Sequence, residues 1–225
     1  CIAKFPKSNE DAITDSEAWE QTMLTLMGRA SITVPKSRLL RVKGRSVLLM
    51  KRFDRSQSHR IPYISGLSAV QGNDGDTYTY LELAEFIENC GSNPGRDLAE
   101  LWRRALFSCA VGNTDNHLRN YGFLREEGGW RLSPVFDVNP TRGGGEKYLA
   151  TALDFGRPEA DARIAFEVSD YFRVSKTEAK GYARRLAAVL RRWQVTARQQ
   201  GISDASIKAM EPGFARGISN LEAAI

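Results

Sequence analysis

Apolar residues recur at every third or fourth position in several parts of the chain, a spacing that places them on one face of a helix. A first helix is predicted after a capping-box sequence at residues 14–17. Its inward face consists of four apolar side chains: Trp19, Met23, Leu26 and Met27. A later stripe begins at Asp97 and continues to Ala110, and its width indicates a central helix that is buried on most sides.

Two other helices are predicted from their first residues. A Thr-x-x-Glu sequence at residues 79–82 predicts a helix that ends at Gly91. A Ser-x-x-Glu sequence at residues 175–178 predicts a long helix whose apolar side continues to Trp193. The other side of this helix is rich in Lys and Arg, and we interpret it as a solvated surface rather than a nucleic-acid patch. One or two helices are expected to close the chain.

Strand-like runs predict a small sheet near the start of the chain, at residues 2–5, 38–42 and 46–50. Residues 56–76 show no regular period and are expected to be irregular. Two more runs, at residues 121–124 and 130–132, are joined by a Gly-containing turn and predict a hairpin.

These elements predict an α+β fold with two unequal parts. A small strand-plus-helix lobe is expected over residues 1–54, and a larger, mainly helical lobe over residues 55–225. With 225 residues, of which 42% are hydrophobic, the chain is large enough to bury a substantial core. The opening at Cys1, without an initiator Met and apparently within a strand, predicts that an amino-terminal portion is missing.

Composition narrows the class of protein. The net charge of +5 suits an anionic ligand such as a nucleotide and does not by itself indicate nucleic-acid binding. Cys90 and Cys109 lie on apolar helical faces, so they are expected to be buried free thiols, which fits a reducing, cytoplasmic location. His59 and His117 are the only histidines, which argues against a histidine-based zinc site. We find no signal peptide and no apolar stretch of membrane-spanning length, so no membrane association is expected.

The chemistry is concentrated in one run and one later residue. Asp115 and Asn120 are five positions apart, and Asp137 follows 17 positions after Asn120. Phosphoryl transfer requires a carboxylate that orients and deprotonates the acceptor hydroxyl, and oxygen ligands for Mg²⁺. The predicted hairpin between Asn120 and Asp137 would return the chain and place these two side chains together. The spacing therefore favours a phosphotransferase.

Asp137 has a rival in the literal kinase triplet at residues 154–156, Asp-Phe-Gly. Asp154 lies 34 positions after Asn120, about twice the gap that one short hairpin needs. No predicted element returns this triplet to Asn120. We therefore favour Asp137 as the metal-binding residue.

With these residues in view, the chain resembles the carboxy-terminal kinase domain of the HipA family of bacterial serine/threonine kinase toxins. The resemblance implies a protein-kinase-like bilobal fold, with a small lobe that is partial here because the family's glycine-rich phosphate loop is expected before Cys1. It rests on Lys4 and on residues 34–35, 52–55, 81–85, 101–104, 113–120 and 132–140.

The resemblance implies a role for each residue of the catalytic run. Asp115 corresponds to the catalytic base, Asn120 and Asp137 to the magnesium ligands, and His117 to a neighbour of the nucleotide phosphates. Simpler explanations remain open: Asp115 could close a turn, Asn120 could satisfy a carbonyl at the end of a strand, and His117 could bond to the backbone.

The same resemblance implies a nucleotide site in the small lobe. Lys4 would contact the α- and β-phosphates, with Glu20 as its partner in the first helix, and the backbone of Lys51, Arg52 and Phe53 would hold the adenine. Lys4 could instead be a lysine that protects the edge of a sheet from aggregation.

The function implied is an ATP- and Mg²⁺-dependent protein serine/threonine kinase, the toxin of a type II toxin–antitoxin system. Its expected partners are a HipB-like DNA-binding antitoxin and a cytosolic protein substrate such as an aminoacyl-tRNA synthetase, with DNA reached only through the antitoxin. Two alternatives remain: a small-molecule phosphotransferase of the same fold, and a non-catalytic fragment that binds an antitoxin.

Overall fold

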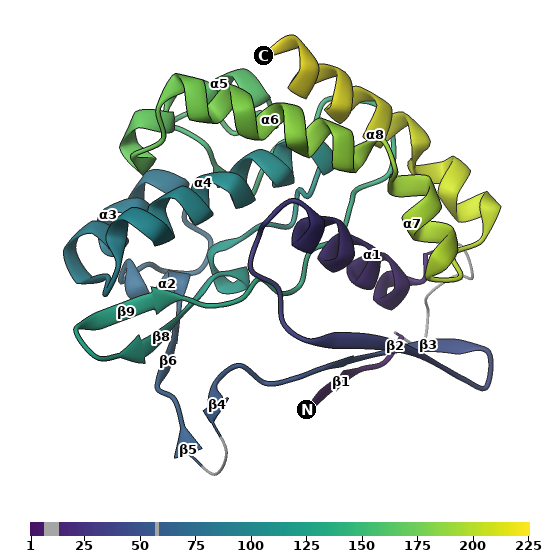
Figure 1. Ribbon diagram of the computed structural model, residues 1–225, viewed down its shortest axis with the longest axis horizontal. Coiled ribbons are helices and arrows are strands. Elements are labelled where there is room, and N and C mark those ends of the chain that lie inside the picture. Colours follow the sequence, from purple (N-terminus) through teal and green to yellow (C-terminus); the bar gives the residue numbers. More distant parts are fainter. Residues whose placement is uncertain (7–13, 57–58) are drawn as a thin grey trace.

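The structure is a computed structural model that describes residues 1–6, 14–56 and 59–225. A small twisted sheet lies on one side of the molecule, and most of the helices lie on the other (Figure 1). Helix α1 (Ser16–Arg29) lies between the sheet and the carboxy-terminal helices, and it contacts both. The polypeptide is therefore mixed α and β, as its apolar pattern predicts.

The small sheet has the strand order β1-β3-β2, formed by β1 (Ile2–Lys4), β2 (Ser37–Val42) and β3 (Arg45–Met50). Both pairings are antiparallel, and Lys4 of β1 and Leu39 of β2 lie opposite Leu48 of the central strand. Lys43 and Gly44 form the turn between β2 and β3 with positive φ angles of 48° and 78°, the combination that a two-residue hairpin turn requires. These three strands confirm the prediction for this region.

Helix α1 confirms the predicted inward face, but the predicted capping box is wrong. Asp15, rather than Thr14, is the N-cap, and its carboxylate accepts from the backbone N–H of Ala18. The same carboxylate pairs with Arg41 and accepts from the Ser46 hydroxyl, both in the small sheet. The helix therefore begins where its cap can also be anchored to the sheet.

An aromatic cluster fixes α1 against the end of the chain. Trp19 packs against Trp193, the first residue of α7 (Trp193–Gln199), and against Phe214 of α8 (Asp204–Ala223). Trp193 and Phe214 stack with ring centroids 4.1 Å apart. The Trp19 indole N–H donates to the Ser206 hydroxyl at 2.9 Å, so the polar atom of this buried ring is satisfied.

The helical part is built around α4 (Pro94–Val111), the predicted central helix. Its apolar stripe is buried, but the helix begins three residues before Asp97, with Asn93 as N-cap and Pro94 in the first turn. Asp97 is buried and accepts from the Leu132 N–H at 2.7 Å. This residue therefore anchors the predicted hairpin to α4 instead of starting the helix.

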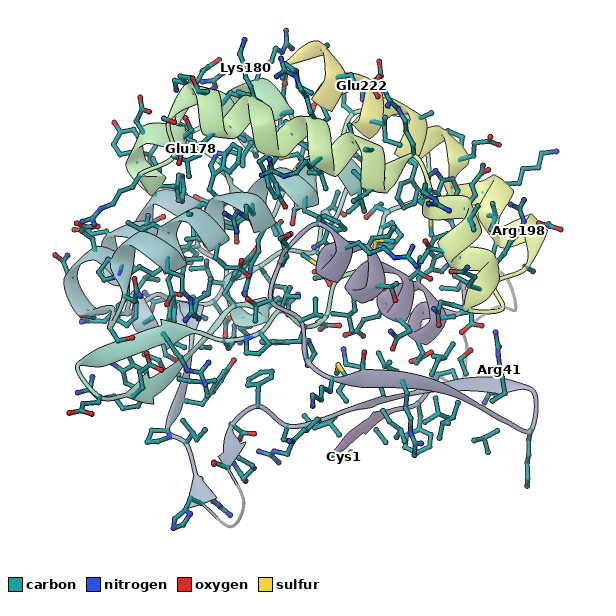
Figure 2. The ribbon with its side chains drawn as sticks, viewed as in Figure 1. Cys1, Arg41, Glu178, Lys180, Arg198 and Glu222 are labelled. Atoms are coloured by element: carbon teal, nitrogen blue, oxygen red, sulfur yellow. The ribbon has the colours of Figure 1, made fainter. Side chains whose placement is uncertain are left out.

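The predicted capping boxes of α3 (Tyr80–Cys90) and α6 (Lys176–Leu190) are both present. Helix α6 ends at Leu190, so the continuous helix predicted through Trp193 is wrong. Lys180 projects outward from α6 (Figure 2), and Arg191 pairs with Glu222 of α8 at 2.7 Å. Helix α5 (Ala162–Glu167) and the short 3-10 helix η2 (Ser169–Phe172) precede α6.

Residues 56–76 contain more regular structure than the sequence predicts, apart from residues 57–58, which lie outside the described part. They include the end of β4 (Arg55–Ser56), β5 (His59–Arg60), β6 (Tyr63–Ser65) and α2 (Gly66–Ala69). Elements this short carry no detectable period. Strand β6 extends the predicted hairpin, β8 (Gly122–Glu126) and β9 (Gly129–Leu132), into a sheet of order β6-β8-β9.

Of the two cysteines predicted to be buried, one is buried and the other is exposed. Cys109 of α4 is buried, as expected, whereas Cys90 is exposed because it is the last residue of α3 and lies beyond the packed face. Within residues 1–6, 14–56 and 59–225, no helix combines the length and the apolar character needed to span a membrane.

Candidate active site

The end of α4 directs the chain into the predicted catalytic loop. Gly112 caps the helix in the left-handed conformation, with φ of 63°, and the Asn113 N–H donates to the Ser108 carbonyl. Asn113 is buried, whereas the side chain of Asp115 is 84% exposed. A rigid, buried helix therefore presents one carboxylate to the solvent.

The structure brings three predicted site residues together in this loop. The Asn120 side-chain N–H donates to the Asp115 backbone carbonyl at 2.8 Å. His117 Nε2 lies 3.7 Å from Asp115 Oδ1. Asn120 closes the 3-10 turn η1 (Leu118–Asn120), just before the hairpin begins. Because the Asn120 nitrogen is engaged, its side-chain oxygen is the atom left to bind a ligand.

A second group brings together residues from three distant segments. Lys4 of β1 donates to both carboxylate oxygens of Glu20 in α1, at 2.7 and 2.9 Å, and to Asp137 Oδ1 at 2.9 Å. The Asp137 backbone N–H donates to Glu20 Oε1 at 2.8 Å. The predicted Lys4–Glu20 pair is thus formed, and Asp137 is joined to it.

Burial and charge act in opposite directions on this group. Burial by itself would lower the pKa of Lys4, but the carboxylates of Glu20 and Asp137 outweigh it and raise the pKa above its usual value. For Glu20, burial raises the pKa and the Lys4 ammonium opposes the rise without cancelling it. The Glu20 carboxylate is almost completely buried, so it depends on Lys4 and on the Asp137 N–H to remain charged.

Asp137 adopts a left-handed backbone conformation, with φ of 57°. Asp is one of the few residue types other than Gly that adopts this conformation readily, although it usually costs about 1 kcal/mol or more. The side chain remains about half exposed, with Oδ1 on Lys4; Oδ2 makes no hydrogen bond or ion pair among the described residues and suits a cation. The chain reaches this position from the hairpin exit, where the Ser133 N–H donates to the Gly122 carbonyl.

Hydrogen bonds connect the predicted catalytic loop, residues 113–120, within itself, and they likewise connect the group formed by Lys4, Glu20 and Asp137. Among the described residues, no hydrogen bond or ion pair joins Asn120 to Asp137 directly. Both residues have a side-chain oxygen that suits Mg²⁺, and their shared coordination of one cation stays a prediction. The described residues contain no cluster of three His, Cys, Asp or Glu side chains that would hold a metal.

An apolar cavity of about 280 Å³ adjoins Lys4. It is lined by Ile2, Lys4, Pro35, Met50, Lys51, Arg52, Phe53, Asp54, Tyr63 and Phe136. Phe53 packs against Phe136 and Tyr63, with ring centroids 5.8 and 6.3 Å apart. The segment predicted to hold adenine therefore forms part of a cavity that has an ammonium group at its edge.

The contributions of Tyr63 and Phe136 to this cavity were not predicted from the sequence. Tyr63 belongs to β6, a strand that was not predicted, so no sequence signal pointed to it. Phe136 was detectable, because it directly precedes Asp137 in the motif.

The Asp-Phe-Gly triplet at residues 154–156 forms a surface turn. Asp154 accepts from the Phe155 N–H and pairs with Arg157 at 3.7 Å, and Gly156 has a φ of 69°. Phe155 is 66% exposed. The carboxylate is thus used locally, and the preference for Asp137 as the metal-binding residue stays a prediction.

The segment just before this triplet contacts the loop that carries Asp115, although no hydrogen bond or ion pair joins the triplet itself to Asn120 among the described residues. Strand β10 (Thr151–Ala152) pairs in parallel with β7 (Tyr78–Thr79), and the Ala150 N–H donates to the Thr114 carbonyl at 3.1 Å. Two-residue strands leave no period in a sequence, which explains why this contact was not predicted.

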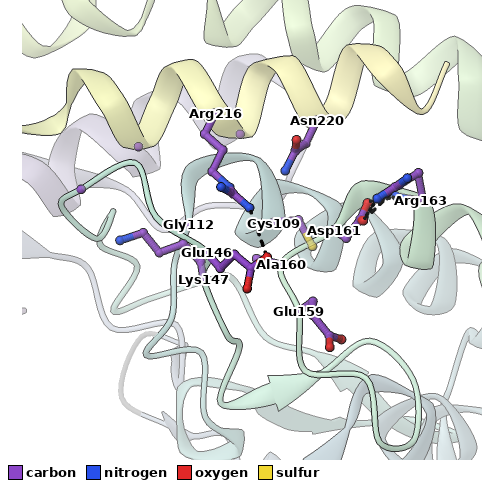
Figure 3. Close-up of a pocket in the computed structure, with 13 residues that line it drawn as sticks. Cys109, Gly112, Glu146, Lys147, Glu159, Ala160, Asp161, Arg163, Arg216 and Asn220 are labelled. Carbon is purple, nitrogen blue, oxygen red and sulfur yellow. Dashed lines mark hydrogen bonds and ion pairs between the residues drawn. The ribbon is translucent and has the colours of Figure 1, made fainter.

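A separate cavity of about 160 Å³ lies between the end of α4, the segments around residues 146 and 160, and α8 (Figure 3). Charged side chains of both signs line it, and Arg216 faces Glu146 across 4.0 Å. None of the predicted site residues lines this cavity.

The fold is kinase-like. It aligns over 99% of this chain with HipA of Shewanella oneidensis, in a structure of HipA, HipB and their operator DNA (TM-score 0.73, 17% identity, 59% of that chain). It also aligns over 96% of this chain with the Helicobacter pylori proinflammatory kinase CtkA (TM-score 0.56, 15% identity, 90% of that chain).

Residues 1–199 match the HipA-like C-terminal domain, and the chain belongs to this family. Curated relatives include Putative kinase Y4mE of Sinorhizobium fredii, 23% identical over 89% of this chain and 43% of its own length. A Putative kinase of Haemophilus influenzae is 24% identical over 65% of this chain and 48% of its own length. The chain thus spans less than half of these relatives, and together with the family they support a kinase-like function.

Proposed function

We propose that the chain is the core of an ATP- and Mg²⁺-dependent protein serine/threonine kinase. The observation that carries the proposal is the Lys4–Glu20–Asp137 group at the edge of an apolar cavity. An adenine ring would occupy the cavity that Phe53 and Phe136 line, and its phosphates would extend toward Lys4. Kinases require this combination of a flat apolar slot and a fixed ammonium group.

In this proposal Asp115 accepts the proton of the acceptor hydroxyl. Its exposure gives an acceptor access, and its buried neighbours fix the backbone from which it extends. Asn120 and Asp137 would supply oxygen ligands to Mg²⁺, which neutralises phosphate charge when it is bound. His117, beside Asp115, would donate to a phosphate oxygen.

The acceptor would enter through a second cavity of about 280 Å³, which is lined by His117, Arg119 and Tyr78 among others. Its volume accommodates one side chain of a protein or one small alcohol. Phosphorylation of small alcohols and of no protein would therefore select a small-molecule phosphotransferase over a protein kinase.

We further propose that this kinase is the toxin of a type II toxin–antitoxin system in the cytoplasm. Membership of the HipA-like family and likeness to a HipA found with HipB and operator DNA support this proposal. The expected partner is a HipB-like antitoxin through which DNA is reached. The expected substrate is a cytosolic protein such as an aminoacyl-tRNA synthetase.

The decisive experiment replaces Asp115 by Asn in the protein as its gene encodes it. Transfer of the γ-phosphate to a protein acceptor is expected to slow by a factor of about 10² to 10⁴, while ATP still binds. Asp170→Asn is the matched control, because Asp170 is also an exposed Asp and lies outside the site. A near wild-type rate for Asp115→Asn would refute the proposed role of this residue.

A further inference from the structure

Asn116 is a buried polar residue between two exposed ones. It is 1% exposed, whereas its neighbours Asp115 and His117 both reach solvent. A fully buried amide is costly unless each of its polar atoms is paired. The hydrogen bonds of Asn116 therefore identify the segments to which this part of the loop is attached.

The side-chain amide of Asn116 pairs with the backbone of Thr151 in the same way as the backbone of a neighbouring β-strand would. Its oxygen accepts from the Thr151 N–H at 3.2 Å, and its nitrogen donates to the Thr151 carbonyl at 3.1 Å. The Thr151 hydroxyl donates in turn to the Asn116 backbone carbonyl at 2.7 Å. Three hydrogen bonds thus join the loop to β10 at one residue.

The remaining donor of Asn116 reaches the helical core. Its side-chain nitrogen donates to the Tyr80 hydroxyl at 2.9 Å, and that hydroxyl also bonds to the Tyr121 hydroxyl. Tyr80 and Thr151 are both fully buried. A buried polar network in which each member is satisfied fixes one arrangement, because any alternative leaves unpaired groups behind.

Asp115 is held on both sides by backbone contacts. The Asn120 side chain donates to the Asp115 backbone carbonyl. The backbone carbonyl of the next residue, Asn116, accepts from the Thr151 hydroxyl. The segment that contains Thr151 also lines the cavity beside His117. The same hydrogen bonds therefore set the position of Asp115 relative to that cavity.

We propose that Asn116 is a positioning residue for phosphoryl transfer, which clamps the catalytic loop to β10 and so aligns Asp115 with the acceptor hydroxyl. This inference rests on the proposed kinase function and adds a residue to it. The nucleotide cavity is formed by other segments, so the clamp acts on the acceptor side of the site.

The test compares three variants of the full protein. Asn116→Ala removes the three bonds made by the side-chain amide. Thr151→Val removes only the hydroxyl bond and keeps the shape, whereas Thr151→Ser retains the hydroxyl. Asn89→Ala, at an exposed position of α3, is the control. The measurements are kcat with a protein acceptor, the Kd of a non-hydrolysable ATP analogue, and hydrogen exchange of residues 113–117.

Asn116→Ala is expected to lower kcat by about 10- to 100-fold with an unchanged Kd, since small misplacements of a catalytic group cost this much. Thr151→Val should lower kcat less, and Thr151→Ser should restore it. Hydrogen exchange at residues 113–117 should become faster in Asn116→Ala and Thr151→Val alone. A parallel loss of nucleotide affinity would show general damage and would overturn the inference.

The experiment distinguishes failure of the proposed kinase function from failure of the proposed role of Asn116. If the wild-type protein transfers no phosphate to any acceptor, the kinase proposal fails and the hydrogen-exchange result decides whether Asn116 positions the loop. Unchanged exchange in Asn116→Ala would refute the clamp, whatever the activity of the protein.

Discussion

Replacing Lys4 by Met would remove one charge from the centre of the candidate site. The Lys4 ammonium lies 2.7 Å from the Glu20 carboxylate, which is almost completely buried. In the variant this carboxylate keeps only the Asp137 N–H as a partner from the group described above. The substitution therefore tests whether a buried negative charge is stable there without its cation.

The magnitude follows from distance and burial. Two unit charges 2.7 Å apart attract by about 6 kcal/mol at an effective dielectric constant of 20. Removing one partner of a fully buried pair usually costs about 3–5 kcal/mol. Because Lys4 is partly exposed, with 28% of its side chain accessible, we expect a loss of about 2–3 kcal/mol in the free energy of unfolding.

The loss should depend on pH in a defined direction. Burial already raises the pKa of Glu20 above its ordinary value of 4.5, and removing Lys4 removes the group that opposes this rise. The folded variant then binds the Glu20 proton more tightly than the unfolded chain does. Its stability should fall as the pH rises from about 4.5 through the folded-state pKa, so the deficit is largest near neutral pH.

Urea unfolding at a series of pH values, followed by tryptophan fluorescence, measures this effect. Lys180→Met, at an exposed position of α6, is the control and should match the wild type. Adding Glu20→Gln to Lys4→Met should restore part of the stability, because no buried charge remains. A deficit that is independent of pH, or that the double variant does not relieve, would refute this reasoning.

Two other predictions concern the helical part. A thiol-alkylating reagent should modify Cys90 in the native protein, but it should modify Cys109 only after unfolding. The reason is that burial shields the Cys109 thiol and raises its pKa. Peptide mass spectrometry measures the modification at both sites. Gly217→Ala should destabilise the protein by about 1–3 kcal/mol in thermal unfolding, since the new methyl group would lie 2.1 Å from the Ala110 carbonyl oxygen. Gly145→Ala, where nothing lies within 4 Å, should have no comparable effect, and equal stability of both glycine variants would contradict the argument.

The sequence predicted the elements that are long or that carry a strong local signal. The apolar stripe of α4 is repeated over several turns, and the β8–β9 hairpin is marked by its glycines. The pairing of Lys4 with Glu20 was expected from the family resemblance, and the structure contains it.

What the sequence did not predict depends on contacts between distant segments. Strand β6 is three residues long, and its partner β8 lies almost sixty residues later. The clamp between Asn116 and Thr151 likewise joins two positions 35 residues apart. Neither leaves a periodic signal, because the stabilising bonds form only after the chain has folded.

The aromatic cluster around Trp19 has a consequence for how the protein can be controlled. In many enzymes of this fold, a swinging helix breaks the lysine–glutamate pair and so switches activity off. Here Glu20 immediately follows Trp19, which packs against two stacked rings, one from each of the last two helices. Withdrawing α1 would expose a buried indole of roughly 150–250 Å², at a cost of about 4 kcal/mol or more. A state in which this helix tilts and the Lys4–Glu20 pair breaks is therefore disfavoured.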